Sequence, residues 1–157
     1  MCEGNPYTLL QISPVFMINR EDLDRAYFRL QRECHPDKAA PHNRKAAEVA
    51  SAELNKAYQA LKDPVARAKA LANLHGYPLE IQANDPEVLM EALEWRERTS
   101  ASVPDSTVRA QLDDTLQTCL NQIDSVFHKE EFSALSALVT RLAFLQKVRE
   151  DIQGKGV

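Results

Sequence analysis

The sequence predicts an all-α protein, and three observations support this prediction. Apolar residues recur at spacings of three and four along most of the chain, which is the period of one helix face. The 157 residues include only 4 glycines and few β-branched runs, so strands are disfavoured. Asn or Asp precedes several expected helices, often followed by proline, which is typical of a helix start. We expect an N-terminal helical hairpin with short flanking helices, followed by a C-terminal antiparallel three-helix bundle.

The first half begins with a short helix over 5–12, in which Asn5 is the N-cap and Pro6 the first helical residue. A longer amphipathic helix follows, with Asn19 as its cap. Its apolar stripe consists of Leu23, Ala26, Tyr27, Leu30 and Cys34, and a second row consists of Arg25, Arg29 and Arg32. The next helix ends at Asp63-Pro64 and should pack against the basic helix as an antiparallel hairpin.

The residues His35-Pro36-Asp37-Lys38 form the polar break between the two hairpin helices. Pro36 has a fixed φ and no N–H, so it ends the first helix and moves His35 out of the α region. Asp37 can accept hydrogen bonds from nearby backbone and hold a tight turn. The sequence therefore predicts a rigid corner that presents an imidazole, a carboxylate and an ammonium together. Pro-Asp after a helix is also ordinary turn chemistry, so the corner taken alone leaves a contact point and a simple turn both open.

The second half has its own organisation. A helix opened by Pro64 ends at Gly76, and 76–85 is expected to be a linker. Three amphipathic helices follow, starting at Asp85-Pro86, at Pro104-Asp105 and after a turn near Lys129-Glu130. The middle helix carries the stripe Val108, Leu112, Leu116, Cys119, Ile123 and Val126, and the last helix carries Leu135, Leu138, Leu142, Leu145 and Ile152. Short connections between them predict the three-helix bundle.

The helix after Asp85 has two apolar faces. Val88, Ala92, Trp95 and Thr99 form one face, which suits the core of the bundle, whereas Leu89, Met90, Leu93, Glu94 and Glu97 fall in another sector. An apolar centre edged by acids is typical of a binding surface. The alternative is that Leu89 and Leu93 cover the linker or dock on the first domain. Phe144 raises the same question, because it lies on the side of its helix away from the predicted stripe.

Composition and charge exclude several function classes. Residues 1–75 carry 11 Lys and Arg against 9 Asp and Glu, a net charge of +2, and residues 76–157 carry 8 against 14, a net charge of −6. No large basic surface is available for nucleic acid, and no stretch has the length of a membrane span. The N-terminus lacks the layout of a signal or transit peptide. Three scattered cysteines without a Cys-x-x-Cys pair favour a reducing compartment, and we expect a cytoplasmic monomer.

The short first helix, the basic helix, the His-Pro-Asp loop and the helix ending in Leu54-Asn55-Lys56-Ala57-Tyr58 together resemble the J-domain of DnaJ-type co-chaperones, over residues 5 to 75. The resemblance implies that this region contacts a DnaK-type chaperone. The contact residues that it implies are His35, Pro36, Asp37, Lys38, Arg25, Arg29, Arg32 and Tyr27.

A second resemblance covers nearly the whole chain. The segments 68–76, 89–97 and 141–145, placed after a J-domain, are similar to the HscB family of iron–sulfur cluster co-chaperones. The resemblance implies a J-domain over 1–75, a linker over 76–85 and a scaffold-binding domain over 86–157. The J-domain would stimulate the ATPase of the chaperone HscA, and the second domain would deliver the scaffold IscU to it. The implied scaffold-binding residues are Leu89, Met90, Leu93, Glu94, Glu97 and Phe144.

This chain departs from the family pattern at several positions. An acidic residue common in the family one turn beyond Glu97 is Ala101 here, and Ala39 and Ala40 stand where relatives commonly place an aromatic. Phe28 occupies a position that J-domains usually make basic. The zinc-binding Cys pairs of some eukaryotic relatives are absent, which favours a bacterial-type protein.

Two other functions would use some of the same residues. A general J-protein for misfolded clients would share the first domain, but no Gly/Phe-rich segment or zinc-type Cys repeat supports that role. A metal-binding protein using Cys34, His35 and His42 is disfavoured, because adjacent Cys34 and His35 are poorly placed to chelate one zinc ion. A catalytic His–Asp pair lacks a nucleophile in a recognisable context. We therefore expect no enzymatic activity, no cofactor and no metal.

Overall fold

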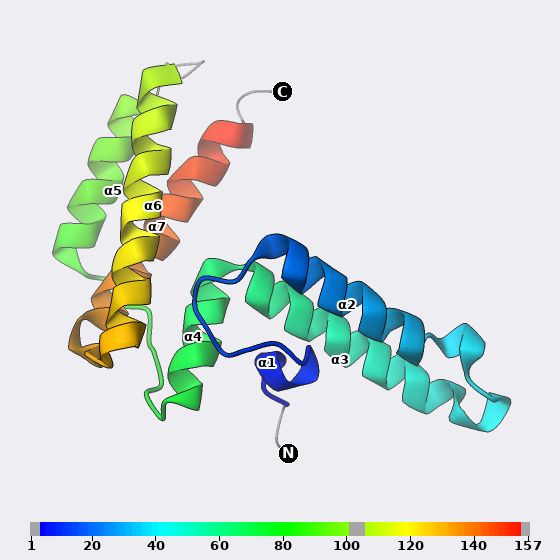
Figure 1. Ribbon diagram of the computed structural model, residues 1–157. Helices are drawn as coiled ribbons and strands as arrows, with labels where there is room; N and C mark the ends of the chain where they lie inside the picture. Colours follow the sequence, from blue (N-terminus) through cyan, green and yellow to red (C-terminus); the bar gives the residue numbers. More distant parts are fainter. Residues whose placement is uncertain (1–3, 101–105, 155–157) are drawn as a thin grey trace. The chain divides into compact units, whose positions relative to one another are not determined.

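The computed structural model describes residues 4–100 and 106–154, and every regular element in these ranges is helical (Figure 1). This confirms the predicted all-α class. The chain divides into two compact units after Pro78. The expected linker 76–85 spans that division.

The first unit is built on an antiparallel hairpin. Its elements are α1 (Pro6–Leu9), α2 (Arg20–Cys34), the 3₁₀ turns η1 (Pro36–Lys38) and η2 (Pro41–Asn43), α3 (Arg44–Lys62) and α4 (Pro64–Leu74). Helix α3 packs against α2, α1 and α4, so it is the central element of this unit (Figure 1). The predicted hairpin with short flanking helices is therefore confirmed.

Side-chain caps define the helix starts as predicted. The Asn5 side chain accepts a hydrogen bond from the Tyr7 backbone N–H at 2.9 Å, and that of Asn19 accepts from the Glu21 N–H at 2.8 Å. Gly76 ends α4 with a φ of +71°, while the Tyr77 N–H donates to the Ala72 carbonyl. This is the Schellman arrangement, in which glycine adopts the left-handed conformation at little cost.

The core of the first unit ties the loop between α1 and α2 to α4. It consists of Tyr7, Leu10, Phe16, Leu23, Leu30, Leu54, Ala57, Leu61, Ala68, Leu71 and Ala72. The buried Tyr7 hydroxyl donates to the Val15 carbonyl at 2.9 Å. The Arg67 guanidinium lies 5.0 Å from the centre of the Phe16 ring and donates to the Leu61 carbonyl. Burial lowers the pKa of Arg67 and raises that of Tyr7, so both groups mark the low-dielectric interior of this unit.

The second unit is the predicted three-helix bundle. It contains α5 (Pro86–Arg98), α6 (Ser106–Lys129), the 3₁₀ turn η3 (Phe132–Ala134) and α7 (Leu135–Gly154). Helix α7 packs against both α5 and α6, so it has the central place in this bundle. Asp85 caps α5 through its bond to the Glu87 N–H at 3.1 Å. The expected helix start at Pro104-Asp105 lies outside the described residues.

The two predicted stripes of this bundle need correction: Val108 is only partly buried, and Val148 is buried in addition to the predicted residues. Phe127, not Val126, is buried at the end of α6, and Val139, not Leu138, is buried in α7. The reason is that α7 packs on two neighbours and therefore buries more than one stripe. Even Thr140 is fully buried, and its hydroxyl accepts a hydrogen bond from the Gln82 N–H at 3.0 Å.

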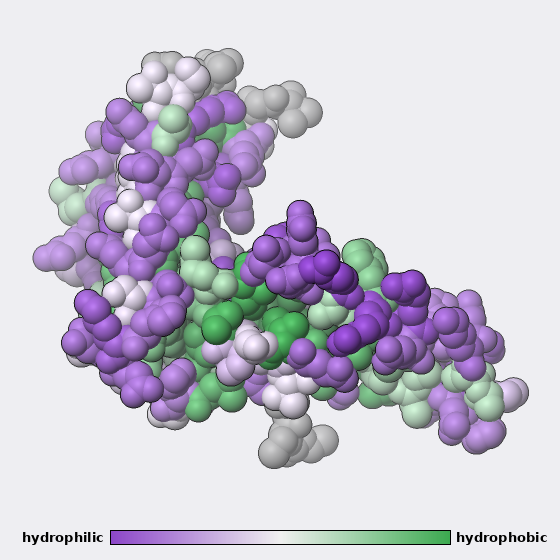
Figure 2. Space-filling model, viewed as in Figure 1, coloured by the Kyte–Doolittle hydropathy of each residue, from purple (hydrophilic) through white to green (hydrophobic). Residues whose placement is uncertain are grey.

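Polar side chains cover most of the face seen in Figure 2. Within the described ranges, no helix combines the length and the apolar character that crossing a membrane would require.

Candidate functional sites

The His-Pro-Asp corner, residues 35–38, has the predicted geometry. His35 ends α2 with φ −63° and ψ 129°, outside the helical region, as the following proline requires. The Asp37 N–H donates to His35 Nδ1 at 3.2 Å, and the Lys38 N–H donates to the His35 carbonyl at 3.0 Å. One carboxylate oxygen of Asp37 lies 3.6 Å from His35 Nδ1. At this distance the carboxylate can form an ion pair with a protonated imidazole. These contacts hold the imidazole and the carboxylate side by side.

The corner is exposed although its backbone is anchored. The His35 side chain is 51% exposed and that of Asp37 is 82% exposed, while η1 packs against α3. An anchored backbone with outward side chains is suited to contact with another protein, because little conformational entropy is lost on binding.

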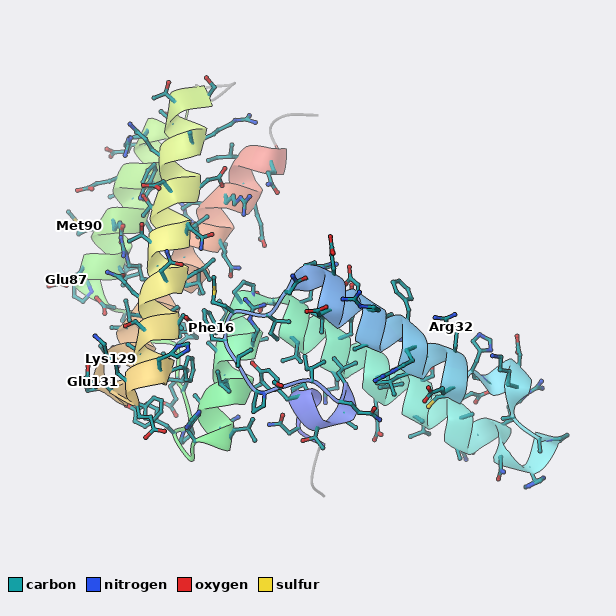
Figure 3. All side chains as sticks on the ribbon, viewed as in Figure 1. Phe16, Arg32, Glu87, Met90, Lys129 and Glu131 are labelled. Carbon is teal, nitrogen blue, oxygen red and sulfur yellow. The ribbon has the colours of Figure 1, made fainter. Side chains whose placement is uncertain are left out.

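The arginine row, Arg25, Arg29 and Arg32, is exposed along α2 as predicted. Arg25 pairs with Asp22 on its own helix, and Arg29 donates to the Gln11 side chain at 3.2 Å. Arg32 donates to the carbonyl of Phe28 at 3.3 Å. The row borders a shallow groove of about 400 Å³ together with Gln11 and Asp22. Figure 3 shows Arg32 directed away from α3.

Tyr27 differs from the other predicted contact residues, because its side chain packs between the two helices of the hairpin, α2 and α3. Its ring stacks on that of Tyr58 with centroids 4.3 Å apart, and its hydroxyl bonds to Asn55. Beside it the Tyr58 hydroxyl donates to Asp24 at 2.7 Å, a bond that lowers the pKa of Asp24 and raises that of Tyr58. Tyr27 is only partly accessible and lies next to the exposed Arg row rather than within it.

The α5 patch, defined as Leu89, Met90, Leu93, Glu94 and Glu97, is exposed as the helical wheel predicted. Leu89, Met90 and Leu93 are 42%, 60% and 52% exposed, and both glutamates are exposed as well. The opposite face, consisting of Val88, Ala92, Trp95 and Thr99, is buried in the bundle. Figure 3 shows Met90 pointing away from α6 and α7. The patch is therefore surface that the second unit does not use for its own core.

An ion pair that sequence reasoning missed holds α5 to α7. Arg141 donates two hydrogen bonds to the Glu91 carboxylate, at 2.7 and 2.8 Å, and both side chains are less than a third exposed. The hydrogen bonds to Glu91 raise the pKa of Arg141. The sequence does place an arginine, Arg141, within the apolar run 138–145, which indicates a buried ion pair. Which acidic residue pairs with it could not be predicted without knowing how the helices pack.

Phe144 lies one turn beyond Arg141 and is partly buried. Helices α5 and α7 run in the same direction (Figure 1), and residues three apart lie on one face of a helix. Since Arg141 meets Glu91, Phe144 is placed at the level of Glu94, beside the α5 patch. The structure thus brings together predicted residues from two helices. Ala101, the expected weak edge of this surface, lies outside the described residues.

The ion pair leads to a prediction about stability. Replacing Arg141 by methionine is expected to lower the free energy of unfolding of the second unit by about 1–3 kcal/mol, because Glu91 keeps its partial burial but loses its partner. The measurement is urea unfolding followed by the fluorescence of Trp95, the single tryptophan, which is buried in this unit.

The matched control for that experiment is Arg149→Met. Arg149 pairs with Asp113 at 3.0 Å, but both side chains are about half exposed, so the loss should stay below about 1 kcal/mol. Equal losses for the two variants would contradict the structural role of the Glu91–Arg141 pair.

No group of three or more His, Cys, Asp or Glu side chains in the described ranges is arranged to hold a metal ion. Cys119 is fully buried, and burial raises the pKa of its thiol to about 11, so the thiol is protonated at neutral pH.

Comparison with known proteins accounts for both units. The family model described as "DnaJ domain" matches residues 5–70, and the model described as "HSCB C-terminal oligomerisation domain" matches residues 84–153. The co-chaperone protein HscB homolog of Bordetella petrii is 28% identical, with 97% of this chain and 96% of that protein covered. The homolog of Neisseria meningitidis serogroup B is 29% identical over 93% of this chain and 95% of that protein.

Solved structures have the same fold. Chaperone HscB from Vibrio cholerae has a TM-score of 0.83 at 25% identity, with 96% of both chains covered. Human co-chaperone protein HscB has a TM-score of 0.84 at 21% identity, over 100% of this chain and 84% of that one. Both domain types occur in order on this chain, and the relatives match along almost its whole length. The chain therefore belongs to the HscB family of iron–sulfur cluster co-chaperones.

Proposed function

We propose that this protein is a two-site adaptor, acting as a monomer in the cytoplasm, that delivers the iron–sulfur scaffold IscU to the DnaK-type chaperone HscA. The J-domain, residues 1–75, docks on the chaperone, and the C-terminal domain, residues 86–157, holds the scaffold. Residues 76–85 connect the two. The observation that carries this proposal is the α5 patch, an exposed apolar surface on a chain that also exposes a His-Pro-Asp corner.

The α5 patch has the anatomy of a protein-binding surface. Leu89, Met90 and Leu93 supply an apolar centre, and Phe144 lies on α7 at the level of Glu94. Burial of such side chains stabilises a complex by about 25 cal/mol per Å² of apolar area removed from water. Glu94 and Glu97 lie at the edge, where carboxylates are suited to orient basic groups of the partner. A scaffold with an apolar contact and a basic rim fits this surface.

The first unit has the opposite charge character. The arginine row is exposed and continues towards the His-Pro-Asp corner at the end of the same helix. A row of cations along one helix face favours association with an acidic protein surface. We infer that this row orients the J-domain on the ATP-bound chaperone and that His35 and Asp37 then make the contact that accelerates hydrolysis.

On this proposal the protein itself performs no chemistry. ATP hydrolysis takes place on the chaperone, and the adaptor acts by bringing the scaffold and the His-Pro-Asp corner to the chaperone together. Its effect is a coupling free energy between the chaperone's nucleotide and client sites. Hydrolysis then locks the chaperone on the scaffold, which favours cluster release.

Single-turnover ATP hydrolysis by HscA tests the proposal. Four mixtures are compared: HscA alone, with this protein, with IscU, and with both. Because the adaptor delivers the scaffold, the rate with both proteins should exceed the product of the two separate stimulations. If an unfolded client protein replaces IscU with the same effect, the general J-protein function is correct instead.

A further inference from the structure

Phe28 is an exposed aromatic residue on an otherwise charged helix face. Its side chain is 58% exposed, more than that of any other large apolar residue described in the first unit. The centre of its ring lies 5.3 Å from the centre of the Tyr27 ring. Single exposed apolar residues are common on protein surfaces, so exposure alone carries no conclusion. What distinguishes Phe28 is its surroundings.

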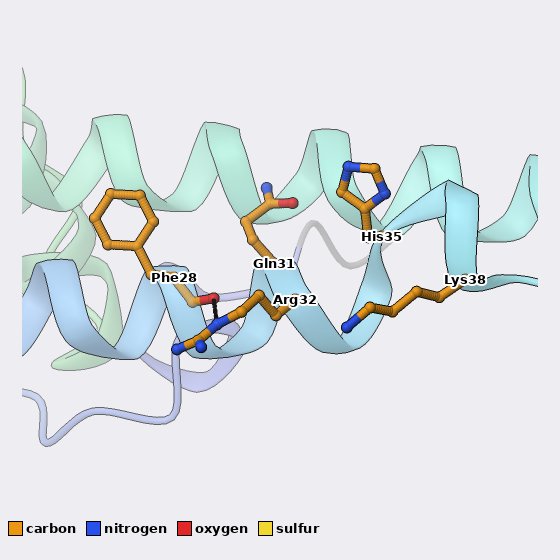
Figure 4. Close-up of a pocket in the computed structure, with 5 residues that line it drawn as sticks. All are labelled: Phe28, Gln31, Arg32, His35 and Lys38. Carbon is orange, nitrogen blue, oxygen red and sulfur yellow. Dashed lines mark hydrogen bonds between the residues drawn. The ribbon is translucent and has the colours of Figure 1, made fainter.

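Phe28 borders a depression that reaches the His-Pro-Asp corner. The depression has a volume of about 420 Å³ and is lined by Phe28, Gln31, Arg32, His35 and Lys38, with mostly carbon exposed inside it. Positions 28, 31 or 32, and 35 follow the i, i+3 or i+4, i+7 spacing of one helix face. Figure 4 shows the rings of Phe28 and His35 projecting on the same side, with Gln31 between them. The aromatic residue and the corner thus belong to one continuous surface.

The rim of this depression is basic. The Arg32 chain runs back towards Phe28, since its Nε donates to the Phe28 carbonyl at 3.3 Å (Figure 4). Lys38 also lines the depression, and its side chain runs towards Arg32 (Figure 4). In the part of the chain that the structure describes, neither cation has a carboxylate partner. A protein surface complementary to this depression therefore has an apolar side chain at its centre and carboxylates around it.

We propose that the depression between Phe28 and His35 receives an apolar side chain of the DnaK-type chaperone, and that Phe28 thereby selects this protein's own chaperone over a general one. The inference rests on the proposed function and adds a specificity-determining residue to the chaperone surface. A chaperone that presents a carboxylate opposite position 28 would suit a lysine there and would leave that carboxylate unpaired against a phenyl ring.

The test is a titration of single-turnover ATP hydrolysis in HscA and in a general DnaK with wild type, Phe28→Ala and Phe28→Lys. For HscA, both variants should raise the concentration giving half-maximal stimulation about fivefold to tenfold, as expected for loss of an interface aromatic. The maximal rate should remain, because the corner is intact. For DnaK, Phe28→Lys should lower that concentration. Both substitutions favour the helix, so folding is preserved.

Met17→Ala is the matched control, because Met17 is 44% exposed and does not line the depression. It should titrate as wild type. If both Phe28 variants need the same concentration as wild type for half-maximal stimulation, Phe28 does not contact the chaperone. If the variants change that concentration equally for HscA and DnaK, Phe28 does not select between the two chaperones. Failure of the proposed function looks different. In that case wild type stimulates neither chaperone, or His35→Gln stimulates as well as wild type.

Discussion

Replacing His35 by glutamine is expected to abolish stimulation of the chaperone ATPase while leaving scaffold binding unchanged. The imidazole Nδ1 accepts the Asp37 N–H and lies next to the Asp37 carboxylate, so His35 organises the corner as well as forming its surface. Glutamine is polar but flexible and does not present a ring nitrogen at that place. We expect the maximal stimulated rate to fall at least about tenfold, which is a loss of about 1.4 kcal/mol of transition-state stabilisation.

Folding should not contribute to this loss. The His35 side chain is about half exposed, and substitutions at such positions usually change stability by less than about 0.5 kcal/mol. His42→Gln is the control, because His42 is an exposed histidine in the neighbouring turn η2. It should stimulate like wild type. If His35→Gln still stimulates ATP hydrolysis by the chaperone, the His-Pro-Asp corner is not the site that accelerates hydrolysis.

The second large effect is expected in scaffold binding. The double variant Leu93→Ser, Phe144→Ala removes an exposed leucine at the centre of the α5 patch and a partly buried aromatic residue on α7. Central apolar residues dominate the energy of protein interfaces, and losing two of them should cost about 2–4 kcal/mol of binding free energy. The Kd for IscU, measured by titration calorimetry, should therefore rise at least about 30-fold.

Val49→Ser provides the comparison for this variant, since Val49 is 54% exposed on α3 in the first unit. Its affinity for IscU should match that of wild type. Stimulation of the chaperone in the absence of IscU should be the same for all three proteins, because the corner is unchanged. An unaltered Kd for the double variant would refute the scaffold-binding role of this surface, and thermal unfolding would show whether Phe144→Ala had disturbed the bundle.

Predictions from the sequence were accurate where a local rule determines the structure. The end of α2 at His35 follows from the fixed φ of Pro36, and the start of α5 follows from Asp85 and Pro86. The division of α5 into a buried and an exposed face was also correct, because the helical period alone separates Trp95 from Leu93. These features depend on residues within one or two turns of each other.

Errors and omissions arose where a residue's surroundings come from another helix. Phe127 and Val139 replaced their predicted neighbours in the core because the packing of α7 on two helices decides which positions are covered. The sequence placed Tyr27 on the apolar stripe of its helix, but its stacking on Tyr58 depends on the register of α2 against α3. The residues lining the Phe28 depression all lie within 28–38, but the position of Lys38 depends on η1, which packs against α3.

The amino-acid sequence was thus sufficient to predict the helices, the His-Pro-Asp corner and the apolar residues of α5 that remain exposed. Those properties follow from backbone dihedral limits and from helical periodicity, which act within a short stretch of chain. Only the tertiary structure decided that Glu91 pairs with Arg141 and that Phe144 therefore lies at the level of Glu94. Both depend on the register of α5 against α7, which is set by the packing of side chains far apart in the sequence.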